Sequence, residues 1–170
     1  MEVSQARLVL GYRHGVTYGS GDYAGMVMLH GLLGAFSHSR LFQEVREKAS
    51  LAYEVHTHIE RTKGLLFVEA GIAAENEERV VEIVRAQIES LGRGTIHAEE
   101  FSATRESYLN ALSMLEDSPG ELLAVDRIWR QHGRAFDLEG WRADLRSVTT
   151  DRVAEAARLL QLDTVFFLRK

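Results

Sequence analysis

The chain has 170 residues, of which 45% are hydrophobic and 26% charged, and this composition indicates one globular domain over residues 1–170 and excludes a mainly disordered chain. It contains no cysteine, which excludes a disulfide framework, a thiolate nucleophile and a cysteine-ligated zinc site, and which fits a cytoplasmic protein. The net charge of −5 argues against a broad nucleic-acid-binding face. Because the longest apolar stretch is well short of the roughly 20 residues that span a bilayer, and no signal peptide is visible, we expect no membrane partner either.

The first part of the chain predicts a strand, two helices and a hairpin. Alternating apolar and polar residues indicate strands, and Asp22 and Ser37 are residue types that cap helices at their N-termini. In chain order, we expect a strand over 5–13, helices over 22–34 and 37–49, and strands over 51–60 and 63–72.

From residue 76 onward the pattern is helical, until a final apolar segment. Capping residues and apolar stripes predict five helices, which lie near 76–92, near 101–115, from Ser118 onward, over 137–141 and from Thr149 or Thr150 onward. The last segment, 164–168, is apolar and rich in β-branched and aromatic residues, which predicts a buried closing strand.

The order of these elements predicts the fold class. A strand, two helices, two strands, a helical run and a final strand do not alternate as in a doubly wound parallel sheet. We therefore expect an α+β fold, with a largely antiparallel sheet and helices packed on one of its faces.

Two histidines provide a candidate metal site. By alternation, the strand over 51–60 places Glu54, His56, His58 and Glu60 on one face, and two histidines in this spacing can bind zinc. The alternative is an ordinary solvated polar face. The chain has no His-x-x-Glu-His motif, so a hydrolytic zinc site cannot be built from a local motif.

Arg46 and Tyr53 are the candidate catalytic residues. Arg46 lies near the C-terminus of a predicted helix, and Tyr53 opens the strand that follows. A guanidinium and a phenol at one rim can both donate hydrogen bonds to a peptide backbone, and the phenol can stabilise a developing oxyanion. The structural alternative is that Arg46 favours the helix dipole and that Tyr53 lies on the core face, where alternation places it.

Short motifs along nearly the whole chain resemble the C-terminal half of an insulinase–pitrilysin-type zinc metallopeptidase. The similarity is greatest to the bacterial members akin to mitochondrial processing peptidase. One departure is Ala35, where the family often has a second glycine. The matching segments are 5–13 with Leu10-Gly11-Tyr12, Asp22-Tyr23, Leu32-Leu33-Gly34, Ser39-Arg40-Leu41-Phe42, Val45-Arg46-Glu47-Lys48, Leu51-Ala52-Tyr53, Lys63-Gly64-Leu65-Leu66, Ala70-Gly71-Ile72, Asp117-Ser118, Val148-Thr149 and 162–168.

This resemblance implies a fold, partners and a function. Peptidases of this family are clamshells of two similar halves, in one chain or in two subunits. The N-terminal half or partner carries the zinc motif and activates water, and the C-terminal half contributes an arginine and a tyrosine that grip the substrate backbone. These residues match Arg46 and Tyr53. We therefore expect one lobe of a dimeric or two-lobed zinc endopeptidase that acts on peptides, with zinc in the complementary half and none bound by this chain.

Two other functions stay open. The same fold could be a non-catalytic scaffold subunit, whose surfaces hold a partner protein. A metal-binding module that uses His56 and His58 is the third hypothesis.

Overall fold

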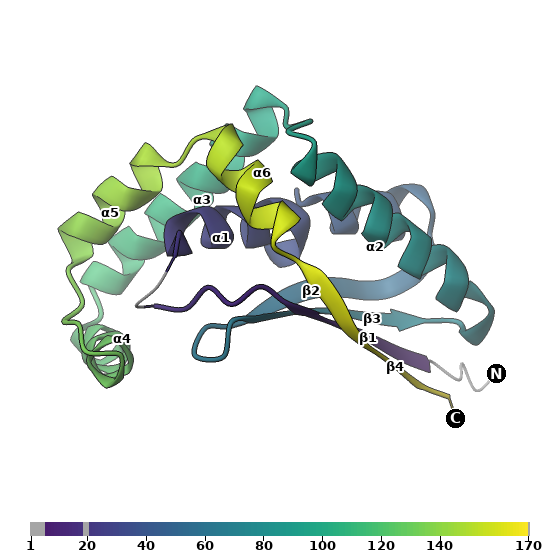
Figure 1. The fold of residues 1–170 in the computed structure, drawn as a ribbon, viewed down its shortest axis with the longest axis horizontal. Coiled ribbons are helices and arrows are strands. Elements are labelled where there is room, and N and C mark those ends of the chain that lie inside the picture. Colours follow the sequence, from purple (N-terminus) through teal and green to yellow (C-terminus); the bar gives the residue numbers. More distant parts are fainter. Residues whose placement is uncertain (1–5, 19–20, 170) are drawn as a thin grey trace.

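The computed structural model describes residues 6–18 and 21–169 (Figure 1). Its elements follow the predicted order; the first predicted strand also included Gln5, which lies outside the described residues. The elements are β1 (Ala6–Arg13), α1 (Tyr23–His30), η1 (Gly31–Ala35), η2 (Phe42–Lys48), β2 (Ala52–Glu60), β3 (Leu65–Ile72), η3 (Ala74–Asn76), α2 (Glu77–Gly92), α3 (Ala98–Glu116), α4 (Pro119–Gln131), α5 (Leu138–Ser147), α6 (Thr150–Arg158) and β4 (Gln161–Leu168).

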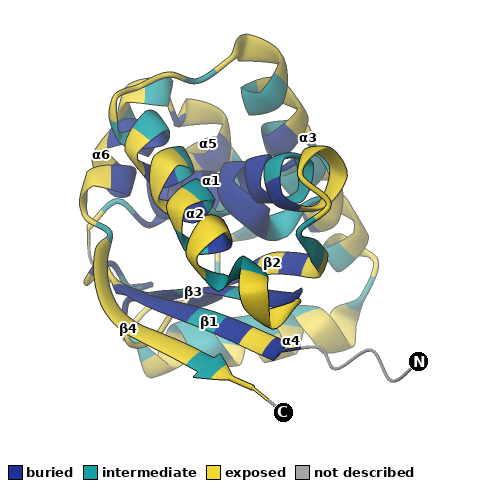
Figure 2. Cartoon of the chain, turned by 90° about the vertical axis from the view of Figure 1, so that its right-hand side faces the viewer, coloured by how far each residue is buried: buried dark blue, intermediate teal, exposed yellow. Residues whose placement is uncertain are grey.

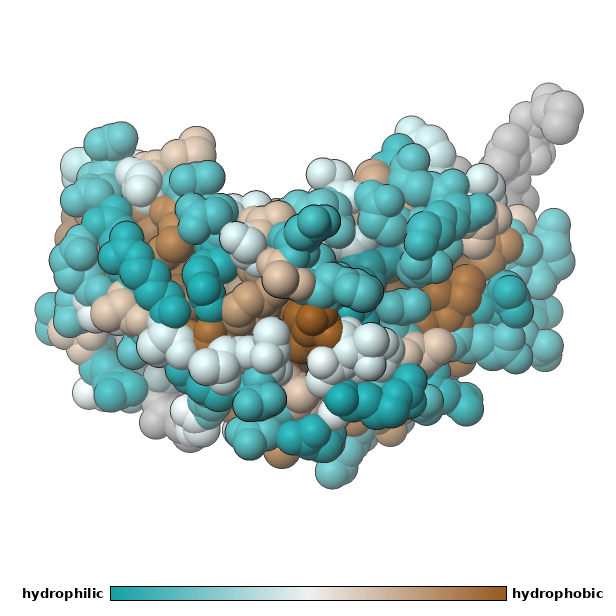
Figure 3. Space-filling view, turned by 90° about the horizontal axis from the view of Figure 1, so that it is seen from above, coloured by the Kyte–Doolittle hydropathy of each residue, from teal (hydrophilic) through white to brown (hydrophobic). Residues whose placement is uncertain are grey.

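The four strands form one antiparallel sheet in the order β2-β3-β1-β4, so that β2 and β4 are its two edges. Figure 1 shows the helices on one side of this sheet, with α4 standing beside its end. Viewed from above, the outer surface of the helical layer is mostly hydrophilic (Figure 3). This arrangement confirms the predicted α+β class.

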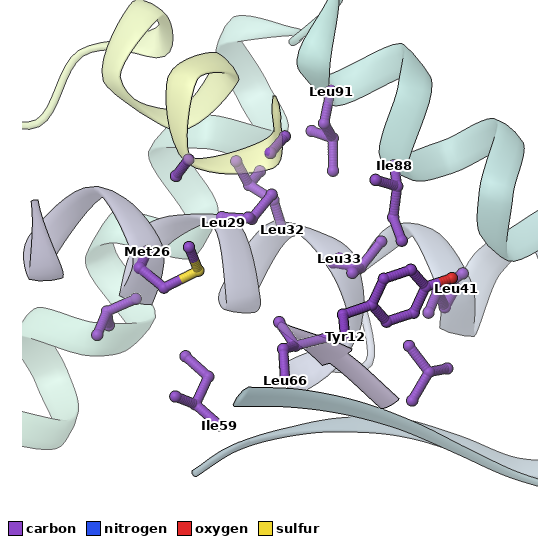
Figure 4. Close-up of a cluster of buried hydrophobic side chains, with 14 of the residues drawn as sticks. Tyr12, Met26, Leu29, Leu32, Leu33, Leu41, Ile59, Leu66, Ile88 and Leu91 are labelled. Atoms are coloured by element: carbon purple, nitrogen blue, oxygen red, sulfur yellow. The ribbon is translucent and has the colours of Figure 1, made fainter. Parts of the chain in front are cut away.

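The core lies between the sheet and the helices, and α1 with η1 runs through its middle. Every residue of α1 except the last is buried, because the helix is covered by the sheet on one side and by α6 and α5 on others. Figure 4 shows Met26, Leu29 and Leu33 between Leu66 of the sheet and Leu91 of α2. The first helix is therefore a fixed support for the segments that follow it.

The predicted cap of α1 is confirmed and also ties two helices together. Asp22 Oδ1 accepts the Gly25 N–H at 2.8 Å. Its two carboxylate oxygens also accept hydrogen bonds from Arg152 of α6, each at 2.6 Å. The hydrogen bonds from Arg152 outweigh partial burial and lower the pKa of Asp22.

Two helix boundaries differ from the prediction. The helix expected directly after Ser37 begins at Arg40 and continues as η2 from Phe42, because residues 36–39 form a turn instead. The short helix expected over 137–141 extends to Ser147, although Asp137 does cap it by accepting the Gly140 N–H at 3.0 Å.

The prediction that the last strand is buried was wrong. The strand is longer than expected, pairs with β1 alone among the described strands, and is exposed over nearly its whole length (Figure 2). Phe166 is 52% exposed and Leu168 is 57% exposed. An apolar sequence predicts that a strand contacts something apolar, but among the described residues of β4 only Phe167 packs against the core.

Candidate functional site

A buried arginine fixes the segment that leads into η2. The Arg40 guanidinium donates to both carboxylate oxygens of Glu100, at 2.5 and 3.1 Å, to the Thr95 carbonyl at 2.5 Å and to Ser90 Oγ at 3.2 Å. Burial raises the pKa of Glu100, but the hydrogen bonds from Arg40 and from the His97 backbone outweigh it and hold that pKa below its usual value. The start of η2 is therefore attached to the loop between α2 and α3.

Arg46 lies on the solvent side of η2. Its guanidinium carbon is 4.7 Å from the centre of the Phe42 ring, and its Nε is 3.8 Å from Glu47 Oε1. The Arg46 side chain is 43% exposed, so its charge is free to meet a partner from outside the chain. The aromatic face below it restricts the directions in which the guanidinium can point.

The backbone turns sharply between η2 and β2. Ser50 has a φ of +53°, a left-handed conformation that few non-glycine residues adopt. Directly after it, the Leu51 N–H donates to the Val45 carbonyl at 2.9 Å. This bond closes a tight loop, so the start of β2 lies against the end of η2.

A β-bulge at the start of β2 determines where Tyr53 points. Ala52 pairs with Ile72 and Glu54 pairs with Gly71, so Tyr53 is the extra residue on its strand. Its side chain is 72% exposed, whereas Val55 is buried. The expectation that Tyr53 lies on the core face was therefore wrong, because the bulge breaks the alternation on which it rested.

The structure places Arg46 and Tyr53 on the same junction between η2 and β2, and leaves both in solvent. No hydrogen bond joins them within the described residues. A guanidinium and a phenol that keep their donors free can each donate to a carbonyl oxygen of an extended peptide. The arrangement can therefore bind a peptide backbone and supply a proton donor to an oxygen that gains negative charge.

Sequence reasoning missed a partly buried histidine that supports β2. His30 Nε2 lies 3.1 Å from the Thr57 carbonyl of β2, and its Nδ1 lies 2.8 Å from the Tyr108 hydroxyl of α3. Burial lowers the pKa of His30 to about 4, so the ring is neutral at pH 7. Nε2 then donates to Thr57, and Nδ1 accepts from Tyr108. The one available signal was a histidine inside an otherwise apolar helix.

The histidines of β2 do not form a metal site with the rest of the described chain. His56 and His58 are exposed on one face, as alternation predicts, but the structure holds no group of three or more potential ligands within residues 6–18 and 21–169. The carboxylate opposite His56 belongs to Glu69, which is ion-paired with Arg7 at 2.5 Å. The described residues therefore do not fit a zinc ion.

Three kinds of comparison with known proteins give consistent results. The family model described as the peptidase M16 inactive domain matches residues 1–108. The Bacillus subtilis protein YmfF, described as a probable inactive metalloprotease, is 35% identical over 170 residues, which are 99% of this chain and 39% of that protein. YmxG of the same organism, described as an uncharacterized zinc protease, is 28% identical over 94% of this chain and 39% of its own length.

Solved structures share the fold. A conserved protein from Enterococcus faecalis V583 superimposes with a TM-score of 0.92 at 29% identity, over 98% of this chain and 40% of that one. A protease from Helicobacter pylori gives a TM-score of 0.87 at 19% identity, over 100% of this chain and 42% of that one.

The chain spans about two fifths of the length of the curated relatives that it matches. Within its described residues, no helix combines the length and the apolar character needed to cross a bilayer. The cytoplasmic location stays a prediction of the sequence.

Proposed function

The chain belongs to the family of peptidase M16 inactive domains, and we propose that it is the substrate-gripping lobe of a zinc-dependent endopeptidase that cleaves peptides in a two-lobed chamber. The observation that carries the proposal is the bulge that turns Tyr53 into solvent at the start of β2, the strand that follows the helix of Arg46. β-Bulges are common next to active sites, where they re-aim a side chain. A tyrosine that only completed the core would have no need of one.

In this proposal the two side chains act on the substrate backbone. Tyr53 donates its phenolic proton as a hydrogen bond to the oxygen of the scissile carbonyl, where negative charge develops. Arg46 donates to a neighbouring backbone carbonyl and so fixes the position of the peptide. Because the described residues do not fit zinc, the metal belongs to the complementary half or to a partner subunit.

The proposed partner is a zinc-bearing lobe, joined to this chain or separate from it, and residues 1–170 form a single domain of the pair. The relatives are more than twice as long as this chain, which leaves room for such a lobe. The exposed apolar strand β4 supports the same proposal, because an uncovered apolar edge strand is prone to pair with another chain. A heterodimer would cover it.

A scaffold subunit is the second candidate. It is favoured by the similarity to YmfF, a protein described as a probable inactive metalloprotease. In that function β4 would still contact a partner, but Arg46 and Tyr53 would have no substrate.

Two single-residue variants test the peptidase proposal. Arg46→Ala and Tyr53→Phe are placed in the complete assembly with a candidate zinc-bearing partner, and cleavage of a quenched fluorescent peptide is followed. Each variant should lower turnover by about 10²-fold or more, while zinc content and fold stay unchanged, because Tyr53→Phe removes the donor to the developing charge and Arg46→Ala removes the donor that positions the peptide. Lys48→Ala removes an exposed cation from the same helix and is the matched control.

The outcomes separate the two candidates. Wild-type turnover in both variants would remove Arg46 and Tyr53 from catalysis. An assembly that forms with wild-type affinity, but cleaves no peptide in any variant or in the wild type, would favour the scaffold.

A further inference from the structure

A cavity of about 300 Å³ lies at the end of the sheet, under α4. Its walls come from several parts of the chain. Tyr23 belongs to α1, Tyr108 to α3, Trp129 to α4 and Trp141 to α5, while Arg61 belongs to the turn between β2 and β3. A volume of this size is at the lower end of the range of small-molecule pockets, so it suits one ring with a short side chain.

Apart from Arg61 and Glu121, the walls are aromatic and aliphatic. Tyr18 and Trp129 have ring centroids 5.1 Å apart, Tyr23 and Trp141 5.3 Å apart, and the two tryptophans 5.8 Å apart. Burial raises the pKa of Tyr23 and of Tyr108, so both phenols stay neutral at physiological pH. Such walls favour an aromatic or other apolar body through area burial and ring packing.

One unpaired cation borders this aromatic space. Arg61 donates from Nη1 to the Tyr18 hydroxyl at 3.3 Å, and within residues 6–18 and 21–169 no carboxylate lies at ion-pair distance from it. A guanidinium has five N–H donors in a planar fork that matches a carboxylate. The other charged side chain of the lining is Glu121 on α4, which would repel an anion and so restrict it to the Arg61 end.

We propose that this cavity binds a small carboxylate with an aromatic body, whose ring lies among the aromatic walls and whose carboxylate accepts hydrogen bonds from Arg61. The negative charge of the ligand complements Arg61, the unpaired cation of the lining, and its aromatic ring complements the aromatic walls. The site shares no residue with Arg46 and Tyr53, so it goes beyond the proposed peptidase function and stands or fails without it.

Intrinsic fluorescence gives a direct test, because the chain has two tryptophans and both line the cavity. Phenylpropionate is titrated into the 170-residue chain, with phenylpropionamide as its uncharged counterpart and acetate as the charge without the ring. Phenylpropionate should give a saturable change, the amide should bind about tenfold more weakly, and acetate should give none. An acetylated dipeptide that ends in phenylalanine distinguishes a peptide C-terminus from a free acid, according to which of the two binds more tightly.

Protein variants test the two halves of the site separately. Arg61→Gln should weaken phenylpropionate binding about tenfold and abolish the preference over the amide. Ala111→Leu fills the cavity from α3 and should abolish binding of both compounds. Arg79→Gln, which removes an exposed arginine of α2, is the matched control and should bind as the wild type does. Far-ultraviolet circular dichroism verifies that each variant is folded.

Three results would overturn the proposal. They are no saturable change with phenylpropionate, equal affinity for the acid and the amide, or wild-type affinity in Arg61→Gln. Tyr53→Phe should retain the binding in any case, since it is remote from the cavity.

Discussion

The two edges of the sheet expose opposite kinds of surface. At the β2 edge, the exposed side chains are polar or amphipathic, and they include Tyr53, His56 and His58. At the β4 edge they include large apolar side chains, with Val165, Phe166 and Leu168 each about half exposed, beside the polar residues at its start. Figure 2 shows β4 exposed along its length, in contrast to the buried helix α1 behind it.

The two edges also differ in what holds them. The β2 edge is tied to the helical layer by two polar side chains, the buried Arg40 just before η2 and the partly buried His30, which is hydrogen-bonded to the Thr57 carbonyl. The β4 edge is held by its ladder with β1 and by two surface ion pairs, Arg13 with Asp163 and Arg169 with Glu77. The backbone that carries Tyr53 is thus held in place by polar contacts, so the side chain is exposed by the fold itself. On β4, by contrast, the described residues leave most side chains uncovered.

The largest effect should come from removing the anchor of the β2 edge. Arg40→Ala leaves the Glu100 carboxylate partly buried without its partner, and breaking such a buried pair costs about 3–5 kcal/mol of unfolding free energy. Urea denaturation followed by tryptophan fluorescence measures it.

Arg46→Ala is the matched control, because it removes the same side chain from an exposed position only six residues away. Its effect on the unfolding free energy should be within about 0.5 kcal/mol. If the two variants were equally stable, the contrast between an anchored and an exposed arginine would be wrong.

The contrast between the edges also shows which parts of the structure the sequence can predict. The cap at Asp22 and the alternation in β3 depend on residues close in the chain, and both were predicted. The bulge at Tyr53 depends on how β2 pairs with residues 71 and 72, which no local pattern reports. Whether β4 is buried depends on what packs against it in three dimensions, which its apolar sequence does not report. Arg46 and Tyr53 were singled out firmly only through the family resemblance, because an arginine near a helix end and an aromatic in a strand have ordinary structural roles.

A smaller effect should follow from the titration of His30. Burial lowers its pKa to about 4 in the folded protein, below the ordinary value of about 6.5 that it regains on unfolding. Between these values the unfolded chain binds a proton that the folded chain does not. The stabilisation is therefore complete above pH 6.5 and is lost as the pH falls, by about 1–2 kcal/mol between pH 7 and pH 5. Urea denaturation at several pH values measures it.

Two histidine variants separate this contribution from others. His30→Gln should flatten the dependence between pH 7 and pH 5, although its stability at pH 7 is lower. His56→Gln, at an exposed position of the same edge, should keep the wild-type slope. His14, whose pKa is also lowered by burial, adds to the slope in the same direction. A wild-type protein with no slope in this range would mean that His30 is charged when folded.

The smallest effect on folding should come from the β4 edge. Phe166→Thr removes a half-exposed ring but keeps a residue that favours strands, so the unfolding free energy of the isolated chain should change by no more than about 0.5 kcal/mol. Val68→Thr is the matched control within the sheet. It places a hydroxyl at a buried position of β3 and should cost about 1–3 kcal/mol.

In the complete two-lobed assembly, the same two variants should differ in the opposite way in their affinity for the partner lobe. Phe166→Thr should weaken binding of the partner lobe, whereas Val68→Thr should leave it unchanged. A large loss of stability in isolated Phe166→Thr, independent of protein concentration, would show that the chain itself covers β4, and the apolar edge would then no longer indicate a partner.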